Sequence, residues 1–181
     1  MIQNFGEDDM IHLGEFGYPG YFIERDGAIY RAKNKHWVPL KYYKNTNGLT
    51  VVNLIREDGK RTSVPVANLV GKAFLPGMTK HDNTIINLNG DRSDNRVENL
   101  AWRPRWFANE YHKMFRDHSV DDEENPVIEL ETEFVFPNVM SACVHYGILF
   151  GDVLVSIETT LPSYGGPPRT TYPTGTSWAF H

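Results

Sequence analysis

The pattern of apolar and polar positions predicts a strand-rich first half. From Tyr21 onward, short apolar runs alternate with turn signals, which favours antiparallel strands. The expected strands are Tyr21–Ile23, Ala28–Arg31, Trp37–Leu40, Leu49–Arg56 and Arg61–Val66. The Asp26-Gly27 dipeptide between the first two predicts a hairpin. The apolar period then changes over Val66–Phe74, which indicates a short helix that Pro76-Gly77 ends.

Residues 85–112 combine turn signals, polar side chains and the start of a helix. Ile85–Asn89 and Leu100–Trp102 are expected to be strands on either side of a turn at Gly90, and a helix is expected after Pro104. Five residues of that helix recur at helical spacing and are expected to share one face: Trp106, Phe107, Tyr111, Met114 and Phe115. Asn109 and His112, an i, i+3 pair, then lie together on another face. The segment predicts two strands, a loop and a helix.

The ends of the chain read differently from its middle. Residues 1–20 mix acidic residues with glycines and predict a flexible acidic arm, and the acidic run 118–125 predicts a linker. After it come a predicted hairpin over Pro126–Phe136, a helix over Val139–Tyr146 and a second helix over Phe150–Ile157. Asn138 is the expected N-cap of the first helix and Gly147 its C′ residue. Residues 172–180 are expected to turn at 173–175 and pack back on the hairpin. The fold class is therefore α+β, with domains at 21–117 and 126–181.

Composition limits the class of protein. A chain of 181 residues with 40% hydrophobic residues can bury a core. The single cysteine excludes a disulfide within the chain and a cysteine zinc cluster. We find neither a secretory signal nor a membrane span, so we expect an intracellular protein that does not bind membranes.

The charge is unevenly distributed. The net charge is −5, but residues 22–117 carry 17 Lys and Arg against 10 Asp and Glu, giving +7. Residues 1–21 carry −4, and residues 118–181 carry nine acids against one Arg, giving −8. A basic middle between acidic ends is compatible with a nucleic-acid partner, because phosphates require basic residues.

The segment over residues 85–112 resembles the ββα-metal finger of H-N-H nucleases, in particular the homing endonucleases common in phage genomes. The residues that carry the resemblance are Gly90, Asn95, Arg96, Val97, Glu98, Asn99, Leu100 and Trp102, followed by Asn109 and His112 on the helix. The strands and helix over 21–74 resemble the module that precedes this finger in such enzymes. The run after Pro126 resembles their C-terminal helix-turn-helix repeat.

The resemblance also shows what this chain lacks at the site. The family's general base, a histidine, falls on Asn87, and a metal-binding Asp or Asn falls on Ile86. An amide cannot take a proton near neutral pH, and isoleucine offers a metal no oxygen. Asn109 remains as a metal ligand, His112 as a supporting or phosphate-facing group, and Asp91 or Asn89 as substitute ligands. A divalent metal such as Mg²⁺ is expected only if the protein is active.

Basic residues supply the candidate contacts to duplex DNA or structured RNA. Those of the sheet module are Lys33, Lys35, Lys41, Lys44, Lys60 and Arg61, interleaved with His36, Trp37, Tyr42 and Tyr43, and those around the finger are Arg92, Arg96, Arg103 and Arg105. The alternative is a solvated charged face. Asn95 and Asn99 are expected to hold loops to strands.

The C-terminal module does not fit DNA as well. In relatives the helix after Gly147 enters the major groove, but here residues 148–159 contain no Lys or Arg. Phe150, Val153 and Val155 would suit a protein partner, or they fill the module's own core.

Three functions remain open. The preferred interpretation is a homing-endonuclease-like phage protein that binds nucleic acid and has lost efficient cleavage, acting in the cytoplasm of an infected bacterial host. The second is an active metal-dependent nicking endonuclease with a site rearranged around Asp91, Asn109 and His112. The third is a subunit recruited to a phage or host protein or ribonucleoprotein assembly through the acidic C-terminal module.

Overall fold

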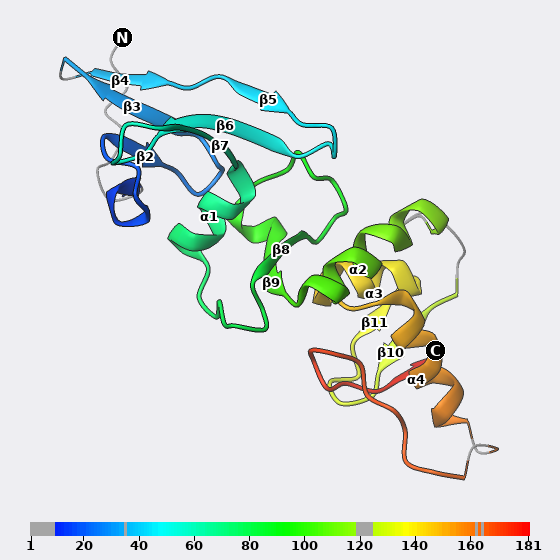
Figure 1. Ribbon diagram of the computed structural model, residues 1–181. Coiled ribbons are helices and arrows are strands. Elements are labelled where there is room, and N and C mark those ends of the chain that lie inside the picture. The colour runs from blue at the N-terminus through cyan, green and yellow to red at the C-terminus, as the bar shows by residue number, and fades with distance from the viewer. Residues whose placement is uncertain (1–9, 35, 119–124, 162, 164) are drawn as a thin grey trace. The chain divides into compact units, whose positions relative to one another are not determined.

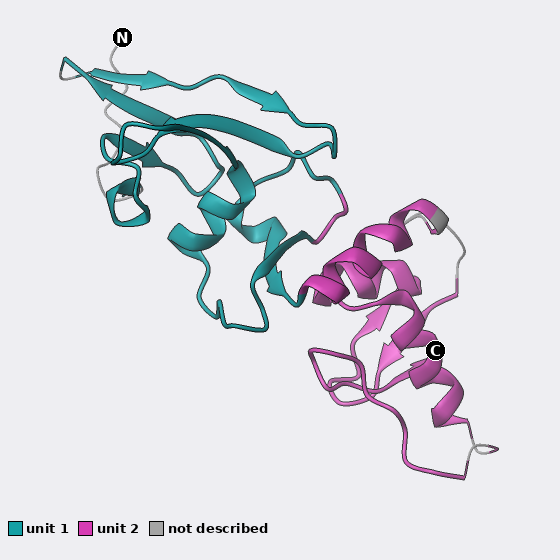
Figure 2. Ribbon diagram, viewed as in Figure 1, with its two compact units in different colours: residues 1–87, 91–104 teal, residues 88–90, 105–181 magenta. Residues whose placement is uncertain are grey.

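The computed structural model describes residues 10–34, 36–118, 125–161, 163 and 165–181 (Figure 1). The chain forms two compact units (Figure 2). Unit 1 comprises residues 1–87 and 91–104, and unit 2 comprises residues 88–90 and 105–181. We describe each unit by itself.

The part of unit 1 that the structure describes contains small antiparallel sheets and one α-helix. One sheet has the order β1-β2-β3-β4, with β1 (Ile11–His12), β2 (Tyr21–Ile23), β3 (Ile29–Lys33) and β4 (His36–Pro39). A second has the order β5-β6-β7, with β5 (Tyr42–Lys44), β6 (Thr50–Ile55) and β7 (Arg61–Pro65). Helix α1 (Val66–Phe74) and the strand pair β8 (Thr84–Asn87) and β9 (Leu100–Arg103) complete the unit, with the 3-10 helices η2 (Leu13–Phe16) and η3 (Val97–Asn99). The predicted strands and helix of this region are confirmed.

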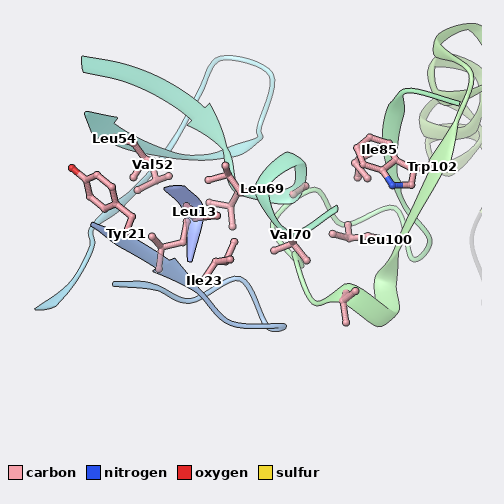
Figure 3. Packing of buried hydrophobic residues seen from close by; sticks show 14 residues of the cluster. Leu13, Tyr21, Ile23, Val52, Leu54, Leu69, Val70, Ile85, Leu100 and Trp102 are labelled. Atoms are coloured by element: carbon pink, nitrogen blue, oxygen red, sulfur yellow. The ribbon is translucent and has the colours of Figure 1, made fainter. Parts of the chain in front are cut away.

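One hydrophobic core joins these elements (Figure 3). Leu54 of β6, Leu69 of α1 and Leu100 of β9 are all buried in it. Gly71 shows how closely α1 approaches the finger strands, because a Cβ there would lie 2.5 Å from the Ile85 side chain and 3.0 Å from Trp102. The sheet module and the strand part of the finger therefore form one folded body.

The expectation of a flexible arm is wrong for residues 10–20. Ile11 of β1 pairs with Ile23 of β2, and Leu13 is fully buried in the core. The apolar side chains at positions 11 and 13 gain more from burial than the nearby glycines lose in chain entropy. Residues 1–9 lie outside the described residues.

Strand β5 was not predicted, because its sequence Tyr-Tyr-Lys shows no apolar alternation. It pairs with β6 between Tyr43 and Val51. The Tyr42 hydroxyl accepts a hydrogen bond from the Ile29 amide at 2.8 Å and lies 3.3 Å from the Gly27 carbonyl oxygen. These contacts to the β2–β3 hairpin fix β5 in place.

In its described residues, unit 2 contains three helices and one sheet. The helices are α2 (Arg105–Asp117), α3 (Val139–Tyr146) and α4 (Phe150–Thr160), and the sheet has the order β11-β10-β12, with β10 (Val127–Glu129), β11 (Val135–Phe136) and β12 (Trp178–Phe180). The Asn138 side chain accepts a hydrogen bond from the Ser141 amide at 2.8 Å, and Gly147 has φ 61°. Both caps and the return of the C-terminus to the hairpin are confirmed. The structure thus has the expected α+β class.

The division between units differs from the predicted domains, because α2 belongs to unit 2. The Tyr111 hydroxyl lies 2.7 Å from the Leu88 carbonyl oxygen and 3.2 Å from that of Cys143. The buried face of α2 is therefore completed by residues that follow it in sequence. Of the predicted linker, residues 119–124 lie outside the described residues.

The apolar residues of α4 play different roles. Val153 is fully buried and fills the core of unit 2, which excludes it as a surface contact. Phe150 is half-buried and stacks on His118 with ring centroids 3.8 Å apart. Val155 is 37% exposed. Within the described residues, no single helix is long and apolar enough to span a membrane, and α3 and α4 reach that length only as a pair bent by 118°.

Candidate functional site

Asn87, at the position of the family's general base, is a buried structural residue. It lies at the end of β8 and is 2% exposed. Its side-chain amide donates a hydrogen bond to the Asp94 carbonyl oxygen at 2.8 Å. Asn99 donates to the same oxygen at 2.9 Å. Two asparagines, one at each end of the loop between β8 and β9, therefore clamp one backbone carbonyl.

The rest of this loop is held by similar local bonds. The Asn95 side chain is 7% exposed and donates to the Ser93 carbonyl oxygen at 3.0 Å. The Val97 amide donates to the Arg25 carbonyl oxygen at 2.9 Å, which ties the loop to the β2–β3 hairpin. The predicted structural role of Asn95 and Asn99 agrees with these bonds. The sequence did not predict the role of Asp94, whose backbone carbonyl accepts from both Asn87 and Asn99, because a backbone acceptor leaves no signature in sequence.

Ile86, at the position of a metal ligand, is fully buried. It pairs with Ala101 across the β8–β9 ladder. An oxygen ligand in its place would have to be desolvated, which costs several kcal/mol without a compensating partner, on the order of 2–7 kcal/mol for a neutral polar group. Position 86 is therefore an apolar, buried position in this chain.

Asp91 lies on the exposed side of the loop, where its carboxylate caps the turn. One oxygen accepts hydrogen bonds from the Ser93 amide at 2.8 Å and the Ser93 hydroxyl at 2.6 Å. These bonds lower the pKa of Asp91, and the nearby Lys44 ammonium contributes in the same direction. Arg92 donates to the Asn47 carbonyl oxygen at 3.2 Å. The finger loop thus lies beside the β5–β6 turn, and two predicted phosphate contacts, Lys44 and Arg92, belong to the same region.

The helix part of the finger presents its polar residues to solvent. Asn109 is exposed and His112 half-buried on α2, with Arg105 and Arg116 also exposed. Positions 105, 109, 112 and 116 are spaced by four, three and four residues, so they form one stripe along the helix. Asn109 and His112 belong to unit 2, whereas Asn87 and Asp91 belong to unit 1.

The predicted basic contacts differ in how accessible they are. Those of the sheet module that the structure describes are all exposed: Lys33, Lys41, Lys44, Lys60 and Arg61. Lys35 lies outside the described residues. Lys60 has a long ion pair of 3.6 Å with Asp58, and both groups are largely exposed. These side chains can reach a phosphate without unfolding any part of unit 1.

Two arginines of the finger are already engaged. Arg96 makes two bonds to the Asp94 carboxylate, at 2.9 Å and 2.7 Å, and this pair raises the pKa of Arg96. Arg103 is half-buried and donates to the Trp102 carbonyl oxygen at 2.9 Å. Arg105 is exposed, and Arg92 is half-buried with one bond of 3.2 Å to the Asn47 carbonyl oxygen, so Arg105 is the most accessible candidate around the finger and Arg92 the next.

The residues do not fit a resident divalent ion on the strand side of the finger. Ile86 offers no donor atom, and Asn87 uses its amide nitrogen to hold Asp94. Across the described residues, no group of three or more His, Cys, Asp or Glu side chains could hold a metal ion. Magnesium requires several oxygen ligands, and Ile86, at the position of one of them, supplies none.

Trp106 corrects the predicted core of α2. Phe107, Tyr111 and Met114 are buried as expected, but Trp106 is 58% exposed. The reason is visible on a helical wheel, because the positions four and seven residues after Trp106 are Glu110 and Lys113, which form an exposed ion pair at 2.7 Å. Trp106 begins a polar face.

Comparison with solved structures identifies the fold. The HNH homing endonuclease I-HmuI, a protein that binds and cleaves DNA, matches with a TM-score of 0.51 over 96% of this chain and 98% of its own, at 18% identity. The chain has the fold of an HNH homing endonuclease. No protein-family model and no curated protein sequence matches it. The match covers residues of both units, so the likeness in fold is not limited to the finger.

Proposed function

We propose that this chain is an HNH homing-endonuclease-like protein that binds duplex DNA and has lost efficient metal-dependent cleavage. The observation that carries the proposal is the clamp at Asn87. A general base must be able to accept a proton near neutral pH and to reach the attacking water. Asn87 has no such basicity, is buried, and donates its amide to Asp94. The neighbouring Ile86 supplies no ligand to a metal.

The basic surface of unit 1 supports DNA binding. Unit 1 carries 14 Lys and Arg against 12 Asp and Glu, whereas unit 2 carries four against 11. The exposed lysines of unit 1 would contact phosphates, which position a protein on DNA without selecting a sequence. The neighbour in fold binds DNA, which favours duplex DNA over RNA as the partner.

Helix α4 does not contribute to this DNA surface. Its exposed positions are Gly151, Leu154, Val155 and Glu158. None can donate a side-chain hydrogen bond to a base edge, and the only charge is negative. We propose that unit 2 contributes its helix α2 to the DNA interface and that α4 faces solvent or a protein. By its resemblance to phage enzymes, the protein would act in the cytoplasm of an infected bacterial host.

The test is to measure binding and cleavage on the same preparation. The full-length protein should retain duplex DNA with an affinity that falls steeply with salt, and supercoiled plasmid should remain intact with Mg²⁺ or Mn²⁺. The Asn87→His variant should keep the bond to Asp94 through one ring nitrogen and present the other as a base. If this variant nicks plasmid and the unaltered protein does not, the missing base is what limits the reaction.

The exposed polar stripe of α2 favours one alternative, a nicking enzyme with a rearranged site. Asn109 and His112 are chemically intact and partly accessible. The alternative predicts that the unaltered protein nicks DNA and that Asn109→Ala abolishes the nicking. Asn68→Ala, on the exposed face of α1, is the control and should nick as the unaltered protein does. Retention of structured RNA in preference to duplex DNA, or of no nucleic acid at all, would also overturn the proposal.

A further inference from the structure

Two half-exposed aromatic rings lie together on the surface of unit 2. Trp106, in the first turn of α2, is 58% exposed, and Tyr172, in the loop before β12, is 39% exposed. Their ring centroids are 6.1 Å apart, with 40° between the ring planes. Both rings pack on the fully buried Phe107, whose ring centroid lies 5.6 Å from each of them in an edge-on arrangement.

Core packing alone does not explain this pair. Trp106 meets Phe107 edge-on, and more than half of its surface remains accessible to a ligand. Rigid rings held on a buried ring are preorganised for a planar ligand, because little conformational entropy is lost when one binds. The remaining question is which planar ligand.

The charges on the exposed side of α2 favour a ligand with phosphates. Arg105 precedes Trp106 and is exposed, and Arg116 extends the same side of the helix. Glu110, an acid on this side, is paired with Lys113. Stacking rings beside exposed guanidinium groups form the arrangement with which proteins bind single-stranded nucleic acids.

We propose that Trp106 and Tyr172 form a stacking site for an unpaired nucleobase. In an intact duplex both faces of each base are covered by its neighbours, so only an extruded, bulged or single-stranded base can offer its face to a protein ring. The inference rests on the proposed function, since it requires a nucleic-acid partner. It adds that the protein prefers nucleic acid in which a base is unstacked.

The experiment compares two probes that differ in one nucleotide. One is an intact DNA duplex, and the other is the same duplex with a single unpaired nucleotide near its centre, both titrated with full-length protein at one salt concentration. The unaltered protein should bind the bulged probe more tightly. Trp106→Ala should weaken binding to the bulged probe by about 5- to 150-fold, the range that one stacked base contributes, and should weaken binding to the intact duplex much less.

Two variants serve as controls. Trp106→Phe keeps a ring and should retain most of the preference for the bulged probe. Phe134→Ala removes another exposed aromatic ring of unit 2, 54% exposed, and should retain the full preference. The bulged probe should quench tryptophan emission more than the intact duplex does, and this difference should disappear in Trp106→Phe even though binding persists.

The outcomes separate the inference from the proposed function. Equal binding of both probes by the unaltered protein, or an unchanged preference in Trp106→Ala, would overturn the stacking site and leave DNA binding intact. Failure to bind either probe would overturn the proposed function and with it the inference. If Trp106→Ala abolishes capture of a protein partner and changes no nucleic-acid affinity, the ring pair is a protein contact instead.

Discussion

The two parts of the finger use their polar residues in opposite ways. In the strand part, Asn87, Asn95 and Asn99 are all buried and donate to backbone carbonyls of the loop between β8 and β9. In the helix part, Arg105 and Asn109 are exposed on α2. The same amide side chain thus holds a loop in one part and faces solvent in the other.

If the proposed function is correct, the frame of an HNH finger can be kept without its cleavage chemistry. A buried asparagine can replace a histidine where the main requirement is a hydrogen-bond donor to Asp94, and an isoleucine can replace a ligand where the neighbourhood is apolar. The chain keeps the fold of an HNH homing endonuclease, while Asn87 and Ile86 offer neither the base nor the oxygen ligand that the resemblance implies at these positions. The helix part retains side chains that can still contact a ligand.

The largest effect is expected from placing a carboxylate in β8. Ile86→Asp should destabilise the protein by about 3–5 kcal/mol, because an unpaired charge would be buried at a position that is now fully buried. Burial favours the neutral acid and would raise its pKa, so the loss should be smaller in acid than at neutral pH. Chemical denaturation at several pH values measures this. A variant as stable as the parent would show that the strand part can still accommodate a metal ligand.

A matched pair of asparagine substitutions tests the comparison directly. Asn87→Ala should cost about 1–3 kcal/mol, since it removes a buried donor, whereas Asn109→Ala should change stability by less than about 0.5 kcal/mol. The double variant with Asn87→Ala and Asn99→Ala should lose more stability than the two single variants lose together, because the Asp94 carbonyl then has neither side-chain donor. Equal losses of stability in Asn87→Ala and Asn109→Ala would contradict the conclusion that Asn87 holds the loop and Asn109 only faces solvent.

The sheet module should determine the salt dependence of DNA binding. Replacing Lys41, Lys44, Lys60 and Arg61 together by alanine should flatten the slope of log affinity against log salt by about 0.9 for each true contact, or by about 3–4 in total. Folding should be nearly unaffected because all four are exposed. Lys72→Ala with Lys80→Ala is the control, and a quadruple variant with the parent slope would place the contacts on Arg92 and Arg105 instead.

The smallest effect is expected on α4, the other helix with an exposed face in unit 2. Glu158→Lys should change duplex binding by less than about twofold at physiological salt, because charges farther than a Debye length of about 8 Å from DNA are screened. A gain of tenfold or more, measured by the same titration, would mean that α4 does approach the groove.

Removing the C-terminal residues is not a fair test of their charge. The charge distribution along the sequence predicts that a fragment ending near Arg116 would bind DNA more tightly than the full chain, because the fragment lacks the acidic C-terminal residues. In the structure Phe107 and Tyr111 of α2 are fully buried within unit 2, and the Tyr111 hydroxyl contacts the Cys143 carbonyl oxygen. Such a fragment would expose the apolar face of α2, so charge substitutions in the full chain are preferable.

Local signals predicted elements accurately. The helices over Val66–Phe74 and Val139–Tyr146 have the predicted bounds. The second is fixed by Asn138 and Gly147, whose effects extend over a few residues. Strand β5 and the burial of Leu13 were missed because both depend on partners elsewhere in the chain, such as Tyr42 on the β2–β3 hairpin.

The sequence by itself determined the finger's frame and the chemistry missing from it, since the absence of a base at Asn87 and of an oxygen at Ile86 follows from the identity of those residues. Only the tertiary structure decided that Asn87 clamps Asp94, that α2 packs within unit 2, and that Trp106 is exposed beside Tyr172. The identity of each residue determines which functional group it carries. Its burial and its hydrogen-bond partners depend on segments that are distant in sequence and meet only when the chain folds.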